Sequence, residues 1–287
     1  TRLVSDWSSD VCSSDLNHDL IRNLKARASW STSFGRPGLA ELRPNETVNE
    51  AAQTLTINNP SLLPQMAKNW DASLEYYFEP VGVISASWFR KTIRDYIVRG
   101  INQGTVAAGN DNGFNGEYQG FTLLTSANAG TATVEGWEFS YQQQFTFLPG
   151  LLKGLGASAN YTLLETHGDF GGVASRGTDE VPGFVPRTAN YGLTWRHRHF
   201  SARAAINYVG RYLTNFTATG SGRNLYRFSR QIVNVGVGYH LRSWLNLTLD
   251  VSNLFNEPEA FYRGIPDQMQ STNIPGTTIT VGMNGRF

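Results

Sequence analysis

A few histidines, carboxylates and one lysine are the residues of this sequence that could do metal or catalytic chemistry. His197 and His199 form a His-x-His pair, which can bind a metal ion, but no third ligand lies near them in the sequence. His167 opens the run HGDFGG, with Asp179 and Glu180 beyond it, and this spacing does not match a calcium loop with ligands at alternate positions. We therefore expect no metal site and no cofactor.

No catalytic constellation stands out either. The glycine-rich run GLLKGLG contains Lys153 but lacks the spacing of a phosphate-binding loop, so we interpret it as a turn. A hydrolase with serine, histidine and an acid near a rim remains an enzyme alternative, with His240 or His167 as its base. Our expectation is that the protein is not an enzyme and has no catalytic residue.

The elements that must position any site are extended strands with one apolar and one polar face. This alternation is clearest in the last 44 residues. One face holds Leu245, Leu247, Leu249, Val251, Ile279, Val281, Met283 and Phe287, and the other holds Asn246, Thr248, Asp250, Ser252, Thr278, Thr280, Asn284 and Arg286. Such strands fit a soluble sandwich, or a membrane barrel whose apolar face looks into lipid.

The connections between strands decide between these two folds. We predict ten strands, at 20–35, 67–78, 83–99, 131–147, 154–168, 186–197, 200–213, 228–241, 244–255 and 276–287. Short turns alternate with long loops along the whole chain. Outer-membrane barrels sort their connections in this way, with short periplasmic turns and long extracellular loops. The fold class is therefore all-β, an antiparallel transmembrane β-barrel.

Charges and aromatic rings support the barrel. Nearly all strand charges fall on the polar face, where they avoid the cost of about 2–4 kcal/mol for a basic residue facing lipid at mid-bilayer. The strand 83–99 is the exception, because Arg90 and Arg94 share the face of Trp88, and we expect either a bulge or an early exit from the bilayer. The rings near strand ends suit interfacial girdles; they are Trp30, Trp70, Trp137, Trp195, Trp244, Tyr76, Phe78, Tyr141, Tyr191, Tyr208 and Tyr239.

Composition sets further bounds. Only 16% of residues are charged and the formal net charge is +1, so there is no nucleic-acid footprint. No apolar stretch reaches the length of a transmembrane helix, and the single Cys12 allows no internal disulfide. The run DWSSDVCSSDL resembles the translation of a DNA-sequencing adapter. We interpret residues 1–16 as a non-native artefact and residues 17–287 as part of a barrel domain.

Three stretches resemble the TonB-dependent outer-membrane receptors. The run NNPSLLPQMAKNWDASLEYYF (58–78) is similar to that family's segment entering a barrel strand, although Gln65 follows Pro64 where the family commonly has Glu. VSNLFNEPEAFY (251–262) is similar to the penultimate strand and its loop. The alternating last strand, ending on Phe287, is similar to the C-terminal signal that barrel-assembly machinery reads. FGRP (34–37) and TVEGWEFSYQ (133–142) also look like this family.

The resemblance implies an active transporter in the Gram-negative outer membrane that imports a scarce small-molecule ligand, such as a ferric siderophore or an oligosaccharide. Such barrels have about 22 strands around a plugged lumen, so ten strands would be a C-terminal portion. A plug and the segment that contacts the TonB complex would precede residue 17. Lipid, the assembly machinery and the TonB complex are the implied partners, and a general porin is the alternative.

Ligand recognition in such a receptor would use polar-face residues near the outer mouth and the long loops. By parity and strand direction the candidates are Asp95, Arg99, Arg211, Arg230 and Asp250. Arginines suit an anionic ligand such as a ferric chelate. Aromatic loop residues would suit sugar stacking, and these are Phe114, Tyr118, Phe121, Phe216, Tyr226, Phe261 and Tyr262.

Overall fold

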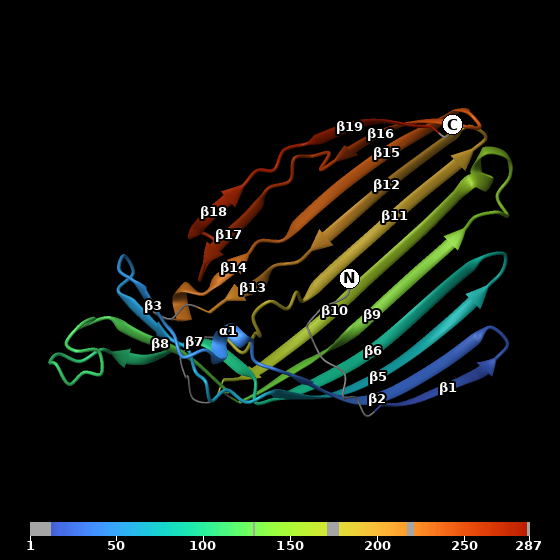
Figure 1. The fold of residues 1–287 in the computed structure, drawn as a ribbon. Coiled ribbons are helices and arrows are strands. Elements are labelled where there is room, and N and C mark those ends of the chain that lie inside the picture. The colour runs from blue at the N-terminus through green and yellow to red at the C-terminus, as the bar shows by residue number, and fades with distance from the viewer. Residues whose placement is uncertain (1–12, 129, 171–177, 217–220, 286–287) are drawn as a thin grey trace.

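The computed structural model describes residues 13–128, 130–170, 178–216 and 221–285, and it is dominated by one curved sheet. Eleven antiparallel strands follow one another across this sheet, each pairing with its neighbours along the chain (Figure 1). They are β1 (Ser13–Ile21), β2 (Leu24–Gly35), β5 (Gln65–Phe78), β6 (Gly82–Arg94), β9 (Thr131–Gln144), β10 (Leu155–Asp169), β11 (Arg187–His197), β12 (Phe200–Val209), β15 (Arg230–Arg242), β16 (Leu245–Ser252) and β19 (Thr278–Gly285).

Two smaller sheets lie in the long connections. One has the order β3 (Glu46–Asn49), β4 (Thr54–Ile57), β8 (Thr122–Asn128) and β7 (Ile97–Thr105). The other has the order β13 (Tyr212–Asn215), β14 (Leu225–Arg227), β17 (Glu259–Arg263) and β18 (Met269–Asn273). The short helices are α1 (Leu39–Leu42), η1 (Gly150–Gly154) and η2 (Ser221–Arg223). In the described part of the chain, no helix is long and apolar enough to cross a membrane.

The predicted sorting of connections by length is confirmed. Figure 1 shows the tight turns at one end of the large sheet, and the loops that carry the smaller sheets at the other end. We call these the turn end and the loop end. At the turn end β11 and β12 are joined by Arg198 and His199, and η1 spans the β9–β10 connection.

The predicted strand 20–35 is wrong at its start. Arg22 and Asn23 form a tight turn between β1 and β2, with Asn23 in the left-handed region at φ 71°. The apolar Leu20 and Ile21 look continuous with Leu24 in the sequence, which hides this reversal. The sheet therefore has an eleventh strand, in which residues 13–16 pair with residues 28–31. The adapter interpretation of residues 1–16 stays a prediction, because pairing geometry does not bear on their origin.

The predicted strand 83–99 also ends early. β6 pairs without a register shift along its full length with both β5 and β9, so there is no bulge. The chain turns at Asp95, whose φ is 55°, and then continues as β7 in another sheet. Arg90 and Arg94 thus occupy the loop end of a strand that leaves the large sheet at once.

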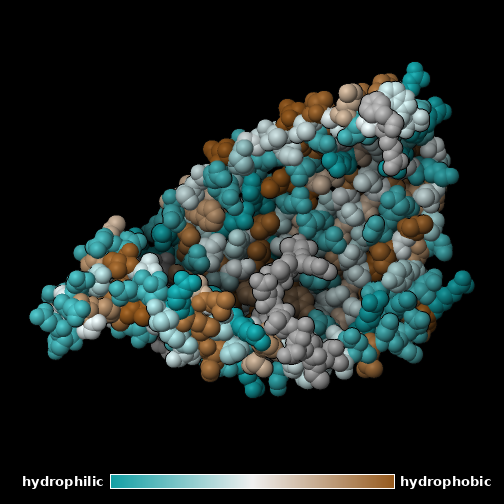
Figure 2. Space-filling view, viewed as in Figure 1, coloured by the Kyte–Doolittle hydropathy of each residue, from teal (hydrophilic) through white to brown (hydrophobic). Residues whose placement is uncertain are grey.

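The two faces of the large sheet differ as the alternation predicts. Apolar side chains on the convex face are exposed, since no described residue packs over them; they include Trp70, Leu74, Trp137, Tyr191, Leu193, Val237, Leu249, Ile279 and Val281. Residues of opposite parity, such as Arg27, Asp71, Glu138 and Arg203, line the concave face. Figure 2 looks into this concave face, where teal and pale atoms cover most of the hollow.

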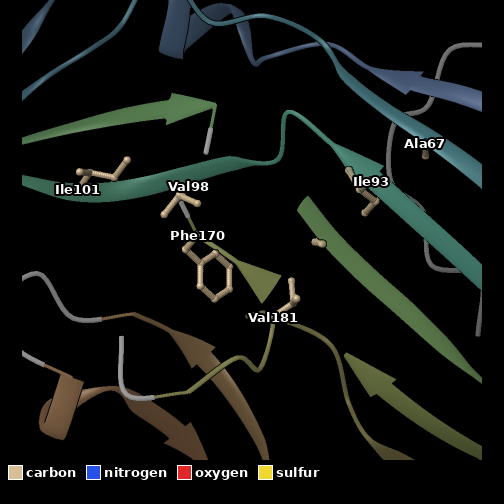
Figure 3. Packing of buried hydrophobic residues seen from close by; sticks show 7 residues of the cluster. Ala67, Ile93, Val98, Ile101, Phe170 and Val181 are labelled. Atoms are coloured by element: carbon tan, nitrogen blue, oxygen red, sulfur yellow. The ribbon is translucent and has the colours of Figure 1, made fainter. Parts of the chain in front are cut away.

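The main buried cluster lies at the loop end of the concave face. Ala67, Ile93 and Ala132 come from adjacent strands of the large sheet, and they pack against Val98 and Ile101 of β7 and against Phe170 and Val181. In Figure 3 the Phe170 ring stands between Val98 and Val181. Folding of the loops back onto the wall thus buries an apolar core across the mouth. The last residue, Phe287, lies outside the described residues.

Candidate functional site

Among the predicted ligand residues, Arg211 has the side chain that is most tightly held by its neighbours. It leaves the large sheet just after β12, and its guanidinium faces the Glu180 carboxylate, with Nη1–Oε1 at 2.9 Å and Nη2–Oε1 at 3.1 Å. The same guanidinium lies 4.7 Å from the centre of the Tyr226 ring. A planar cation held by a fork and a ring face is fixed in orientation. Arg211 is therefore held in a fixed orientation at the mouth, with its charge balanced by Glu180.

An aromatic cluster lies behind the Tyr226 ring that Arg211 contacts. Tyr226 stacks on Tyr262 with ring centres 5.3 Å apart, and Phe228 lies 4.6 Å from Tyr262. Leu213 completes this cluster and is fully buried. Burial raises the pKa of both tyrosines, so their hydroxyls stay protonated as hydrogen-bond donors. The small sheet β13–β14–β17–β18 is thus a stiff aromatic platform.

Asp95 and Arg99 do not continue the polar face of β6, because the turn at Asp95 breaks its parity. The carbonyl of Asp95 accepts a hydrogen bond from Asn128 Nδ2 at 2.7 Å, and its side chain is exposed. Arg99 forms an ion pair with Glu41 of α1. Burial opposes ionisation of Glu41, but hydrogen bonds from Arg99 and the Gly38 N–H lower the pKa of Glu41 overall. Arg99 therefore anchors the first long loop.

Arg230 begins β15 on the concave side of the mouth. Its Nη2 lies 3.5 Å from the Glu257 carbonyl, a long hydrogen bond. Its Nε is buried and has no hydrogen-bond partner among the described residues. A buried donor without a partner costs free energy, so Arg230 retains donor capacity that a ligand could use.

Asp250 lies apart from the other four. It is on the concave wall, where its Oδ1 is 2.6 Å from Arg203 Nη2. The pair lies in a recess of about 700 Å³ that is also lined by Arg196, Thr248 and Gly236. A Cβ at Gly236 would come within 2.2 Å of Asp250 Oδ1, so a larger residue there would have to displace this pair. Asp250 is thus a residue of the lumen wall rather than of the mouth.

The aromatic loop residues form separate groups. Phe114, Tyr118 and Phe121 pack on one another along the connection between β7 and β8, with ring centres 5.9 and 5.8 Å apart. Phe216 meets Phe170 edge to face at 4.8 Å. Tyr226 and Tyr262 belong to the platform described above, next to Phe261 in β17. The rings therefore do not converge on one sugar-binding surface.

Three of the histidines and both loop acids considered for chemistry have side-chain partners within the chain. His167 Nδ1 lies 2.8 Å from Asp179 Oδ2, while Glu180 pairs with Arg211. His197 stacks on Trp195 and His199 packs on Tyr239. Across the described ranges, no group of three or more His, Cys, Asp or Glu side chains is placed to hold a metal ion.

Sequence reasoning missed Glu41, the partner of Arg99, and it considered Glu180 only as a cation ligand and not as the partner of Arg211. Each lies far from its arginine along the chain, with 58 residues separating Glu41 from Arg99 and 31 separating Glu180 from Arg211. No spacing rule links such pairs. Only the folding of the long loops over the mouth brings them together.

Comparison with known proteins gives the geometry a context. Residues 7–254 match the family model described as TonB dependent receptor-like, beta-barrel. The chain belongs to the TonB-dependent receptor family. This family comprises transporters and receptors rather than enzymes. A search of curated proteins gave no match.

Solved structures agree with the family in fold. A ferric enterobactin receptor mutant (PfeA) from Pseudomonas aeruginosa is similar, with TM-score 0.70, 19% identity and coverage of 96% of this chain and 40% of that chain. The siderophore receptor PirA from the same organism has TM-score 0.63 and 20% identity, covering 96% and 41%. The copper transporter OprC has TM-score 0.64 and 16% identity, covering 95% and 38%. This TonB-dependent receptor chain thus spans well under half of each of those chains.

Proposed function

We propose that the protein is an active importer in the Gram-negative outer membrane, and that this chain supplies part of the barrel wall and the mouth of a longer receptor. The large sheet has an apolar convex face and a polar concave face, which suits a wall between lipid and a polar lumen. Its shorter span than that of the solved relatives supports the view that a plug and further strands belong to the complete protein.

The ligand we propose is an anionic chelate of the ferric siderophore class. The observation that carries this is the pair of arginines at the mouth: Arg211, held rigid on Tyr226, and Arg230, with a buried donor left unpaired. Carboxylates and catecholates are the groups that such guanidinium donors bind well. Asp95 and Arg99 would line the same mouth, and Asp250 the path below it.

An oligosaccharide is supported less well, because the aromatic side chains are spread over separate clusters. The proposed partners are outer-membrane lipid, the barrel-assembly machinery and the TonB complex. Phe287 would be the signal that the assembly machinery recognises. The TonB complex would be contacted through a region preceding the barrel.

Uptake of a ⁵⁵Fe-labelled chelate by cells that produce the complete receptor tests this proposal. We expect saturable uptake that stops when the inner membrane is de-energised, and that falls when Arg211 and Arg230 are both replaced by Gln. The matched control is Arg196→Gln on the lumen wall, which should leave the apparent affinity unchanged. Uptake that continues after de-energisation and rises linearly with concentration would favour a general porin instead.

A further inference from the structure

An apolar trough crosses the convex face between β5 and β10. It has a volume of about 440 Å³, and its low points are Ala86 and Ala159. The ridges around them are rings and branched side chains, among them Tyr76, Phe139 and Tyr141. The small side chains of Ala86 and Ala159 between larger ones leave this trough in the apolar surface.

A second hollow of about 370 Å³ extends this trough toward the loop end. Trp88, Trp137 and Leu163 line it, together with Glu135, Glu165 and Arg187. On each strand the two hollows use successive outward positions: Ala86 precedes Trp88 on β6, Phe139 follows Trp137 on β9, and Tyr161 precedes Leu163 on β10. The two hollows therefore lie end to end along these strands, and we call them together the groove, which is apolar at one end and charged at the other.

The charged end of the groove holds two arginines, of which one is paired with an acid. Arg90 and Glu135 are cross-strand partners whose side chains pair at 3.4 Å, and both are partly exposed. Arg187 is exposed and has no ion-pair partner among the described residues. Glu165 is the one acid in the groove without such a partner there. Paired indoles beside arginines are typical of the membrane interface, where apolar and headgroup regions meet.

We propose that this groove binds one lipid of the outer leaflet that carries a phosphomonoester headgroup. An acyl chain fills the trough over Ala86 and Ala159, Trp88 and Trp137 flank the boundary, and the Arg187 guanidinium donates to the phosphate oxygens, a match in shape and charge. The Glu165 carboxylate repels the phosphate, so neutralising Glu165 would strengthen binding of the anionic headgroup. The inference rests on the proposed function only for placing the convex face in a bilayer.

The test is native mass spectrometry of the complete receptor released from detergent micelles. Dioleoyl phosphatidic acid and dioleoyl phosphatidylcholine serve as probes, because they share acyl chains and differ in headgroup charge. We expect the wild type to retain phosphatidic acid about fivefold better, the factor typical of one basic residue beside an anionic lipid. Arg187→Gln should remove this preference and Glu165→Gln should increase it. Ala159→Phe should reduce retention of both lipids.

Ala204→Phe is the matched control, because Ala204 lies on the convex face of β12 outside the groove. It should retain both lipids as the wild type does. Equal retention of the two lipids by the wild type, or unchanged retention by Ala159→Phe, would overturn the inference. Heat-dependent mobility on gels reports barrel folding separately: a wild type that never inserts into a bilayer contradicts the proposed function, whereas an inserted wild type without lipid preference contradicts only the groove.

Discussion

Leu249→Arg is the substitution that probes the assignment of the two faces most sharply. Leu249 points outward from β16, between Val237 of β15 and Val281 of β19, and it is 40% exposed in the chain by itself. The three aliphatic side chains form a row on the convex face. An arginine at a lipid-facing position near mid-bilayer costs about 2–4 kcal/mol. We expect the free energy of unfolding to fall by this amount.

Thr248→Arg is the matched change one residue away. Thr248 lies on the concave face, and its cross-strand partners are Gly238 and Gly282, so a long side chain has room along the wall. We expect a change within about 0.5 kcal/mol, as for an ordinary exposed substitution. Leu249→Gln separates lost apolar contact from charge.

The assay is equilibrium urea unfolding of the complete barrel from phospholipid vesicles, followed by tryptophan fluorescence. Each variant is compared with the wild type at the same lipid ratio. A larger loss for Thr248→Arg than for Leu249→Arg would refute the assignment of the apolar face to lipid.

Three further predictions follow from individual contacts. Gly236→Val should destabilise the barrel by about 1–3 kcal/mol in the same unfolding assay, because its Cβ would collide with Asp250 Oδ1; an unchanged midpoint would contradict the tight fit of the Arg203–Asp250 pair. Phe170→Ala should remove about 3–5 kcal/mol from the mouth cluster, seen as faster amide exchange at Val98 and Ile101 with the wall unaffected. Asp179→Asn should lower the pKa of His167, which the hydrogen bond that His167 donates to the Asp179 carboxylate raises above 6.5; NMR titration measures this, and an unaltered pKa would contradict the pair.

The sign of the pH dependence follows from the two partners. Because the pKa of His167 is raised, its contribution to the stability of the contact is complete below pH 6.5 and is lost as pH rises through the raised pKa. Because the pKa of Asp179 is lowered, its contribution to the stability of the contact is present above pH 3.8 and is lost as pH falls through the lowered pKa. The contact is therefore strongest between these limits. Both side chains are largely exposed, so its effect on stability is small.

The wall of the protein was predictable because its physical cause is local. Alternation fixes which side chains share a face, and the length of each connection fixes the end of the sheet at which it lies. Trp70, Trp137 and Tyr191 are exposed on the convex face, as the alternation predicts. They lie near the middle of β5, β9 and β11 and not at strand ends, where the girdle prediction placed them. Two errors occurred where a single backbone angle reverses the chain, at Asn23 and at Asp95. The predicted strand 200–213 is also wrong at its end, because the chain leaves the large sheet after Val209 and continues as β13 of a smaller sheet.

The mouth was less predictable because its contacts join distant segments. Parity placed Arg99 on the polar face, whereas the turn at Asp95 directs it to Glu41. Arg211 could be named as a candidate, yet its orientation depends on Glu180, from the loop between β10 and β11, and on Tyr226, which lies 15 residues further along its own connection. The smaller sheets have no strong alternation of their own, and β18 is exposed throughout.

Spin-label scanning along β16 tests the central claim most directly. Single cysteines at positions 247 to 251, in a background with Cys12→Ser, would carry nitroxides in the complete barrel reconstituted in vesicles. We predict that labels at Leu247, Leu249 and Val251 collide mainly with oxygen dissolved in lipid, and that labels at Thr248 and Asp250 collide mainly with a water-soluble nickel chelate. Accessibilities that show no period of two, or the opposite phase, would contradict a wall with lipid on its convex face and a polar lumen on its concave face.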